Sequence, residues 1–136
     1  EWKDAGYLVL RAAEIGIPER ITVENNLSGL FIYADPLLER VFYNLIDNSL
    51  QHGDKVTKIR LYCQKLCKGV RLIYEDNGVG VPVAAKPQLF LQGFTTGAGL
   101  GLGLKLIKRL IEVYGWSISE EGEPGLGVKF VITIPD

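Results

Sequence analysis

The stretch Phe42-Tyr-Asn-Leu-Ile-Asp-Asn-Ser-Leu-Gln-His-Gly53 is predicted to form a helix with two different faces, and the rest of the fold is read outward from this helix. Asn44 and Asn48 are four positions apart, and residues at that spacing share one side of an α-helix. Asparagine is a mediocre helix former, so two of them on one mid-helix face need a reason beyond local folding. Another face carries apolar residues at three- and four-residue spacing and is predicted to be buried: Leu38, Val41, Phe42 and Leu45.

The boundaries of this helix are also visible in the sequence. Asp35-Pro36 supplies an N-cap and a proline for the first helical position, and Gly53 is a good C-terminal stop. Upstream, residues 4–14 carry a helical apolar pattern that breaks at Gly16 and Pro18. Two short β-rich runs, 21–24 and 30–33, are separated by turn-forming residues, which predicts a hairpin.

Downstream, strands and one more helix are predicted, with a loop-like segment between them. The strands are 58–64, 70–75, 117–120 and 128–134, the loop is 82–98, and the helix is 100–114. This order predicts the α+β class: a two-layer α/β sandwich whose mixed, mostly antiparallel sheet is covered on one face by helices. The length of 136 residues fits a single domain, 1–136.

Two glycine-containing motifs follow the asparagine helix. Asp76-Asn-Gly-Val-Gly80 comes directly after a predicted strand, and Gly97-Ala-Gly-Leu-Gly-Leu-Gly-Leu104 opens the last long helix. In this order, the three motifs resemble the ATP-binding catalytic domain of sensor histidine kinases. That domain belongs to the wider GHKL superfamily of type II topoisomerases, heat-shock chaperones and mismatch-repair ATPases. The resemblance runs from Asp35 to Pro135 and implies a Bergerat-type ATP-binding fold that takes ATP together with Mg²⁺.

The asparagine pair implies a metal ligand and a choice of reaction. In this family, the second asparagine corresponds to a Mg²⁺ ligand, and the amide oxygen of Asn48 suits that hard cation. The ATPase branch typically has a glutamate one turn earlier, whereas histidine kinases and this chain have an asparagine, Asn44. An amide cannot take a proton from water at neutral pH, so the general base for hydrolysis is absent. We therefore expect Asn44 and Asn48 to serve phosphoryl transfer to another protein.

Asp76 is the expected adenine contact. The exocyclic amine of adenine donates hydrogen bonds and an ionised carboxylate only accepts them, whereas guanine presents an oxygen at that place. GTP should therefore be rejected. Gly78 and Gly80 would let the backbone pass close to the base. An isolated Asp-Asn-Gly is more often a plain turn, but the flanking Gly80-Val81-Pro82 matches the family's first glycine box.

The glycine-rich run is the expected phosphate cradle. Backbone amides at a helix N-terminus attract phosphate, so Gly99 and Gly101 would approach the triphosphate while Leu100 and Leu102 turn inward. A Walker loop is excluded because no lysine occurs in the run before Lys105. A dinucleotide fingerprint is excluded because leucine stands where it needs glycine or alanine.

The resemblance extends to further residues around the nucleotide. Leu89-Phe90 and Gly93-Phe94 correspond to the family's phenylalanine box. Gln51 stands where a basic residue is common, and His52 stands where an aromatic commonly stacks near the base. The full set of expected nucleotide contacts is Asn44, Asn48, Gln51, His52, Asp76, Gly78, Gly80, Val81, Phe90, Phe94, Gly97, Gly99, Leu100, Gly101 and Leu102.

Composition narrows the partners. A net charge of -1, from 15 basic and 16 acidic residues, predicts no binding to nucleic acid. No apolar run approaches the roughly 20 residues that cross a bilayer, so we expect a cytoplasmic domain without direct membrane insertion. Cys63 and Cys67, with a single histidine, cannot complete a four-ligand zinc site and are expected to be reduced thiols. The absence of methionine suggests a segment of a longer protein.

The single histidine, His52, lies on the expected nucleotide helix, so the phosphate acceptor must be elsewhere. The resemblance implies two partners: the dimerisation and histidine phosphotransfer domain of the parent kinase, and the receiver domain of a response regulator downstream. Two alternatives stay open at this point. One is a nucleotide-sensing module that binds ATP without phosphotransfer, and the other is a GHKL-type ATPase.

Overall fold

The computed structural model describes residues 1–33, 35–52, 55–91 and 103–135, apart from the side chains of Ile15 and His52. The strands are β1 (Trp2–Asp4), β2 (Thr22–Asn25), β3 (Phe31–Tyr33), β4 (Lys58–Lys65), β5 (Val70–Asp76), β6 (Ser117–Glu120) and β7 (Lys129–Ile134). The α-helices are α1 (Ala5–Ala12), α2 (Leu37–His52) and α3 (Leu104–Val113), and Ala13–Ile15 and Val83–Gln88 form short 3₁₀ helices.

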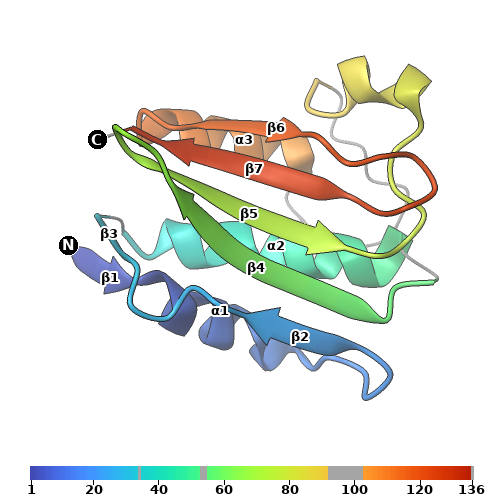
Figure 1. The fold of residues 1–136 in the computed structure, drawn as a ribbon, viewed down its shortest axis with the longest axis horizontal. Helices are drawn as coiled ribbons and strands as arrows, with labels where there is room; N and C mark the ends of the chain where they lie inside the picture. The colour runs from blue at the N-terminus through green and yellow to red at the C-terminus, as the bar shows by residue number, and fades with distance from the viewer. Residues whose placement is uncertain (34, 53–54, 92–102, 136) are drawn as a thin grey trace.

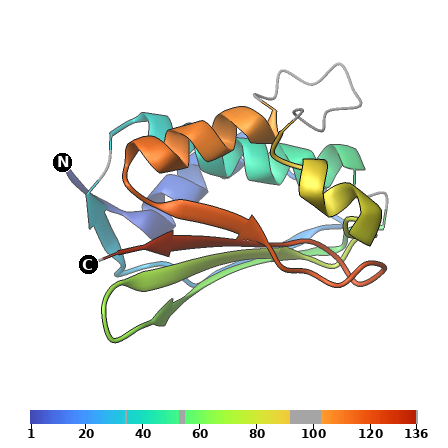
Figure 2. The same cartoon turned by 90° about the horizontal axis from the view of Figure 1, so that it is seen from above.

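The main sheet has the strand order β2-β4-β5-β7-β6. β2 runs parallel to β4, and the other neighbouring strands are antiparallel (Figure 1). Seen from above, α1, α2 and α3 all lie on one side of this sheet (Figure 2). The predicted class is therefore confirmed: an α+β sandwich with a mixed, mostly antiparallel sheet and helices on one face.

Alternation along the strands separates a face that packs on the helices from a helix-free face, although Ile73 and Val131 are buried as well. Successive side chains of a strand point to opposite faces, so Leu72 and Tyr74 point toward the helices while Glu75 lies on the helix-free face. The helix-facing side chains form one apolar core with the inner faces of the three α-helices. Its fully buried members include Phe42, Leu45, Ile59, Leu61, Leu72, Tyr74, Ile107, Ile111, Phe130 and Ile132.

The central helix α2 begins where the sequence predicts. The backbone amide of Leu37 donates to Asp35 Oδ1 at 2.9 Å, which satisfies one of the unpaired amides of the first turn. The Tyr114 hydroxyl also donates to that carboxylate and so joins the end of α3 to the start of α2. Burial, together with the bond to Asp35, raises the pKa of the Tyr114 phenol, which keeps it a donor.

The predicted hairpin between residues 21–24 and 30–33 is wrong. β2 instead pairs with β4, and β3 pairs with β1, a strand that the sequence did not predict. The intervening residues are held elsewhere: Asn25 Nδ2 donates to the Gly6 carbonyl at 3.0 Å, and the Asn26 amide donates to the Leu61 carbonyl at 2.8 Å. Leu27 is fully buried in the core. These contacts lead the chain away from β2 instead of folding it back along β2.

Two other predicted boundaries change. The segment predicted as loop, 82–98, contains the 3₁₀ helix Val83–Gln88, and residues 92–98 lie outside the described residues. The last helix, predicted over 100–114, is described from Leu104 to Val113. Gly115 has φ 79° and its amide donates to the Glu112 carbonyl, so a left-handed glycine ends the helix as predicted. None of the helices in the described part of the chain has both the length and the apolarity for crossing a bilayer.

Truncating Phe130 tests the core. Its ring is fully buried between β5 and Phe90, with centroids 6.4 Å from Tyr74 and 6.2 Å from Phe90. Phe130→Ala should lower the free energy of unfolding by about 3–5 kcal/mol, from lost burial and a residual cavity. Leu126→Ala, at a site 68% exposed, is the control and should change it by less than about 0.5 kcal/mol. Equal effects in urea denaturation would contradict this core.

Candidate functional site

The Asp76 carboxylate, at the end of β5, is held by donors from three segments of the chain. Oδ1 accepts from the backbone amides of Gly78 at 3.0 Å and Val128 at 3.1 Å. Oδ2 accepts from Ser49 Oγ at 2.6 Å. Since an ionised carboxylate offers about four acceptor positions, these bonds leave one position, on Oδ2, that no described residue fills. The carboxylate is thus fixed in orientation and keeps one acceptor for a ligand.

Ser49 connects the Asp76 carboxylate to the buried Tyr74 hydroxyl. Its hydroxyl oxygen also lies 2.6 Å from the Tyr74 hydroxyl. Because Asp76 only accepts, the single Ser49 proton goes to Asp76, and Tyr74 must donate to Ser49. Burial strongly raises the pKa of the Tyr74 phenol, which keeps its proton in place. The chain Tyr74 to Ser49 to Asp76 therefore has one direction, and it connects α2 to β5.

Asn44 and Asn48 lie on the same helix as Ser49, which directly follows Asn48. Asn48 is half-buried and Asn44 is 4% exposed. Asn44 Nδ2 has no hydrogen-bond partner among the described residues. A buried amide without a partner costs free energy. This N–H₂ group can therefore donate hydrogen bonds that no described residue accepts. Gln51, by contrast, is exposed and donates to Asp47 Oδ2 at 3.0 Å.

The first glycine motif wraps closely around Asp76. Gly78 is buried and supplies an amide to the carboxylate, as described above. Gly80 has φ 73°, and a Cβ there would lie 2.8 Å from the Gly127 carbonyl oxygen. Val81 is 7% exposed and belongs to the core. Asn77 points away from this carboxylate and holds the start of β4 by accepting from the amides of Thr57 and Lys58.

Gly127, Ser49, Tyr74 and Val128 are site residues that the sequence analysis did not single out. Gly127 has φ 129°, and a Cβ there would lie 1.9 Å from the Asp76 carbonyl oxygen. No other residue type fits so close to that backbone. The signal was present in the closely spaced glycines of Gly125-Leu-Gly127, between the two last predicted strands. Ser49 carried no comparable local signal, because its partners are distant in the sequence.

The remaining expected contacts divide into two groups. Phe90 is half-buried, packs edge-on against Phe130, and has Lys108 Nζ 5.7 Å from its ring centroid. Phe90 thus has a packing role in the described structure. The other residues lie outside the described residues: Phe94, Gly97, Gly99, Leu100, Gly101, Leu102 and the side chain of His52.

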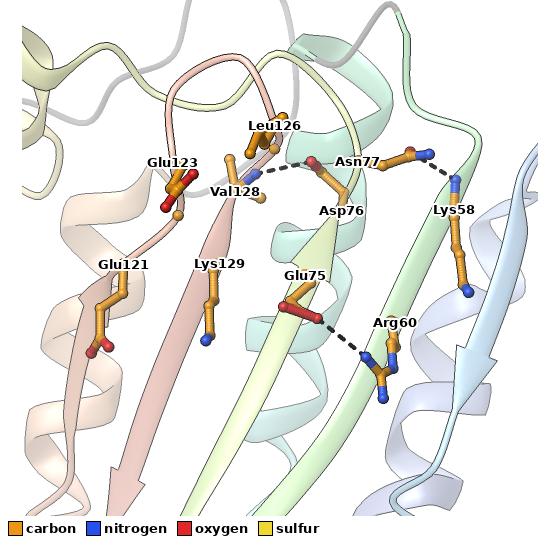
Figure 3. Close-up of a pocket in the computed structure, with 12 residues that line it drawn as sticks. Lys58, Arg60, Glu75, Asp76, Asn77, Glu121, Glu123, Leu126, Val128 and Lys129 are labelled. Carbon is orange, nitrogen blue, oxygen red and sulfur yellow. Dashed lines mark hydrogen bonds and ion pairs between the residues drawn. The ribbon is translucent and has the colours of Figure 1, made fainter.

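A cavity of about 440 Å³ lies next to Asp76 on the helix-free face of the sheet (Figure 3). Its walls carry Lys58, Arg60, Glu75 and Lys129 side chains, with Asp76 and Gly127 at its end. Arg60 forms ion pairs with Glu75 at 3.8 Å and with Glu24 at 3.3 Å. Neither Asn44 nor Asn48 lines this cavity, so it is separate from the asparagine face of α2.

Comparison with known proteins identifies the family. The family described as "Histidine kinase-, DNA gyrase B-, and HSP90-like ATPase" matches residues 34–136. The chain belongs to this family.

Within this family, the chain is similar to sensor proteins and sensory kinases of bacteria. The alginate biosynthesis sensor protein KinB of Pseudomonas aeruginosa is 34% identical over 101 residues, 72% of this chain and 17% of the relative. The adaptive-response sensory kinase SasA of Prochlorococcus marinus is 33% identical over 115 residues, 76% of this chain and 30% of the relative. The chain thus spans less than a third of the length of these two relatives.

Solved structures agree with this assignment. The catalytic domain of the histidine kinase ThkA has a TM-score of 0.78 and 25% identity, covering 99% of this chain and 94% of that one. The ATP-binding domain of PrrB from Mycobacterium tuberculosis has a TM-score of 0.75 and 26% identity, covering 99% of this chain and 96% of that one. The fold is that of histidine kinase catalytic domains.

The hydrogen-bonded chain from Tyr74 through Ser49 to Asp76 leads to a prediction about stability. Ser49→Ala should cost about 1–3 kcal/mol of unfolding free energy, because it leaves the buried Tyr74 hydroxyl without its partner. The double variant Ser49→Ala/Tyr74→Phe removes both hydroxyls and should be more stable than Ser49→Ala alone. Urea denaturation of both single variants and the double variant measures this coupling. Additive losses would show that the two hydroxyls are not bonded to each other.

Proposed function

We propose that residues 1–136 form one domain, the ATP-binding catalytic domain of a two-component sensor histidine kinase. It would transfer the γ-phosphoryl group of Mg-ATP to a histidine on a separate dimerisation domain, from which a response regulator receiver domain takes it. The observation that supports this proposal is the oriented Asp76 carboxylate, which has one acceptor position that no described residue fills and whose hydroxyl donor Ser49 directly follows Asn48 on α2. The cytoplasm, where ATP is available, is the proposed location.

The open acceptor on Asp76 suits adenine. Its exocyclic amine would donate to Oδ2, beside the Ser49 hydroxyl. Guanine would place a carbonyl oxygen against the same carboxylate, and two acceptors facing each other in a partly buried site disfavour binding. The bonds from Gly78 and Val128 prevent the carboxylate from rotating to relieve that repulsion. The selectivity for adenine over guanine would thus follow from the hydrogen bonds that fix the Asp76 carboxylate.

The asparagines suit a triphosphate with its cation. Asn48 has a neutral amide oxygen, and Mg²⁺ commonly takes one or two protein oxygens and fills its shell with phosphates and water. Asn44 Nδ2 is a buried donor without a described partner, so it suits an anionic oxygen of the phosphate chain. Mg²⁺, when bound, would neutralise phosphate charge. The chain's own residues would position the nucleotide, which is most of what phosphoryl transfer asks of a protein.

The phosphate-binding part of the proposal rests on the sequence. Gly97, Gly99, Leu100, Gly101 and Leu102 are proposed to cradle the triphosphate at the start of α3. In the described structure, Gly103 is the N-cap residue, and its carbonyl accepts from Leu106 and Ile107. The positive end of the α3 dipole therefore lies at the residue that directly follows this segment in the sequence. Phe94 and His52 keep their proposed places near the nucleotide, while the bond from Gln51 to Asp47 leaves Gln51 less suited to phosphate.

Phosphotransfer and its two alternatives differ in the fate of the γ-phosphate. With labelled ATP and a dimerisation domain supplied in trans, the proposal predicts acid-labile, base-stable label on that domain. Binding without any label would favour the nucleotide-sensing module. Steady phosphate release by residues 1–136 alone, lost in Asn44→Ala, would favour the ATPase. The ATPase is disfavoured because Asn44 cannot act as the general base.

A further inference from the structure

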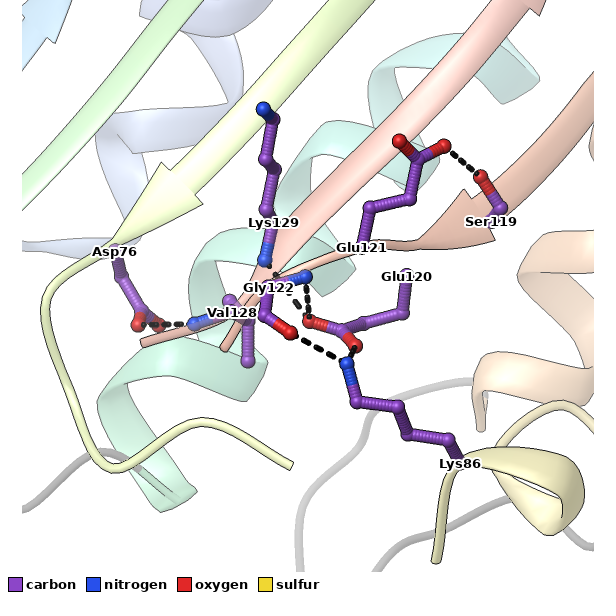
Figure 4. A network of polar contacts seen from close by, with 8 residues as sticks. All are labelled: Asp76, Lys86, Ser119, Glu120, Glu121, Gly122, Val128 and Lys129. Carbon is purple, nitrogen blue, oxygen red and sulfur yellow. Dashed lines mark hydrogen bonds and ion pairs between the residues drawn. The ribbon is translucent and has the colours of Figure 1, made fainter. Parts of the chain in front are cut away.

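A buried ion pair lies beside the site and takes no part in the contacts proposed above. Lys86, on the 3₁₀ helix Val83–Gln88, places its ammonium 2.7 Å from Glu120 Oε1, at the end of β6 (Figure 4). The Glu120 side chain is 2% exposed and that of Lys86 is 25% exposed. Among the described residues, no other group pairs with this carboxylate oxygen. An unpaired buried carboxylate is strongly unfavourable, so Glu120 requires Lys86.

The same two side chains hold both ends of the loop between β6 and β7. Glu120 Oε2 accepts from the amide of Gly122 at 2.9 Å, where the chain enters the loop, and from that of Lys129 at 3.1 Å, where it leaves. Lys86 Nζ donates to the Gly122 carbonyl. A Cβ at Gly122 would lie 2.5 Å from the Gly127 carbonyl oxygen, so the two arms of the loop pack closely.

This loop is the support of Asp76. Val128, one residue before the Lys129 amide, donates to Asp76 Oδ1, and the Asp76 amide donates back to the Val128 carbonyl at 3.1 Å. Gly127 lies against the Asp76 carbonyl. The loop also meets the first glycine motif, because the Gly125 amide donates to the Val79 carbonyl at 2.8 Å. Any change in the path of the loop therefore moves a donor of the carboxylate.

We infer that Lys86 and Glu120 are a positioning pair for the Asp76 carboxylate, which they hold in its ligand-binding orientation through the β6–β7 loop. This inference rests on the proposed function for its consequence, weaker ATP binding when the pair is removed. The hydrogen bonds and ion pair that the structure describes for Lys86 and Glu120 involve none of the expected ligand contacts. It acts through Gly122 and Lys129 on Val128, and through Val128 on Asp76.

The test replaces the pair by apolar residues, Lys86→Leu/Glu120→Val. Such replacements of buried ion pairs often preserve stability, so the variant is expected to fold. Amide hydrogen exchange is measured first, without nucleotide. The Val128 amide bonds to Asp76 and not to Glu120, so faster exchange there reports a displaced loop. We expect its protection to fall about 10-fold, the effect of losing one hydrogen bond to a charged group. Amides near Lys65 and Val70 should keep wild-type protection.

ATP affinity is measured next by calorimetry on the same variant, and we expect it to fall by about the same 10-fold. The matched control is Glu121→Gln, the neighbouring carboxylate, whose ion pair with Arg71 at 3.1 Å is 46% exposed on the Glu121 side. Both measurements should match the wild type there. The single variant Glu120→Gln keeps an acceptor for the loop amides but loses the charge, and should give a smaller effect.

Unchanged Val128 exchange in the double variant would overturn the inference. Faster exchange with unchanged ATP affinity would also overturn it, because the pair would then be structural only. A wild-type chain that fails to bind ATP would overturn the proposed function instead, and the exchange result alone would then decide whether the pair positions Asp76.

Discussion

The structure depends on one carboxylate that is held from three directions. Asp76 receives a hydroxyl from α2, an amide from its own turn, and an amide from the loop that precedes β7. These donors come from parts of the chain that meet only when α2 packs on the sheet and β7 pairs with β5. The fold and the orientation of Asp76 are therefore one property, and a fault in either would appear in the other.

The helix α2 satisfies two demands that conflict in an isolated peptide. Its apolar face fills the core, with Leu38, Phe42 and Leu45 buried, and its other face keeps Asn44 and Asn48 for polar contacts. Asn44 is 4% exposed and its amide nitrogen has no partner in the described part of the chain. Such a group lowers the stability of the free protein and would favour a bound phosphate oxygen. The unpartnered amide of Asn44 thus lowers the stability of the free protein, and a ligand that accepts from this amide would raise it again.

Local patterns in the sequence predicted local structure well. Helical spacing and caps located α2, and alternation located β4, β5, β6 and β7. The errors lie where partners are distant: β2 joined β4 rather than β3, and β1 was not predicted. Ser49 and Glu120 were missed for the same reason, since their bonds to Asp76 and Lys86 cross 27 and 34 positions of sequence respectively. Contacts between residues so far apart leave no periodic pattern in the sequence. The asparagine and glycine motifs, by contrast, are local runs of residues that can be recognised directly.

We propose that the Asp76 carboxylate selects adenine because its free acceptor has a fixed direction. Calorimetric titration of the wild type and Asp76→Asn with Mg-ATP and with Mg-GTP tests it most directly. We expect the wild type to bind ATP and not GTP, and Asp76→Asn to lose most of its ATP affinity while its unfolding transition is kept. Comparable affinity of the wild type for both nucleotides, or unchanged ATP affinity in Asp76→Asn, would contradict it.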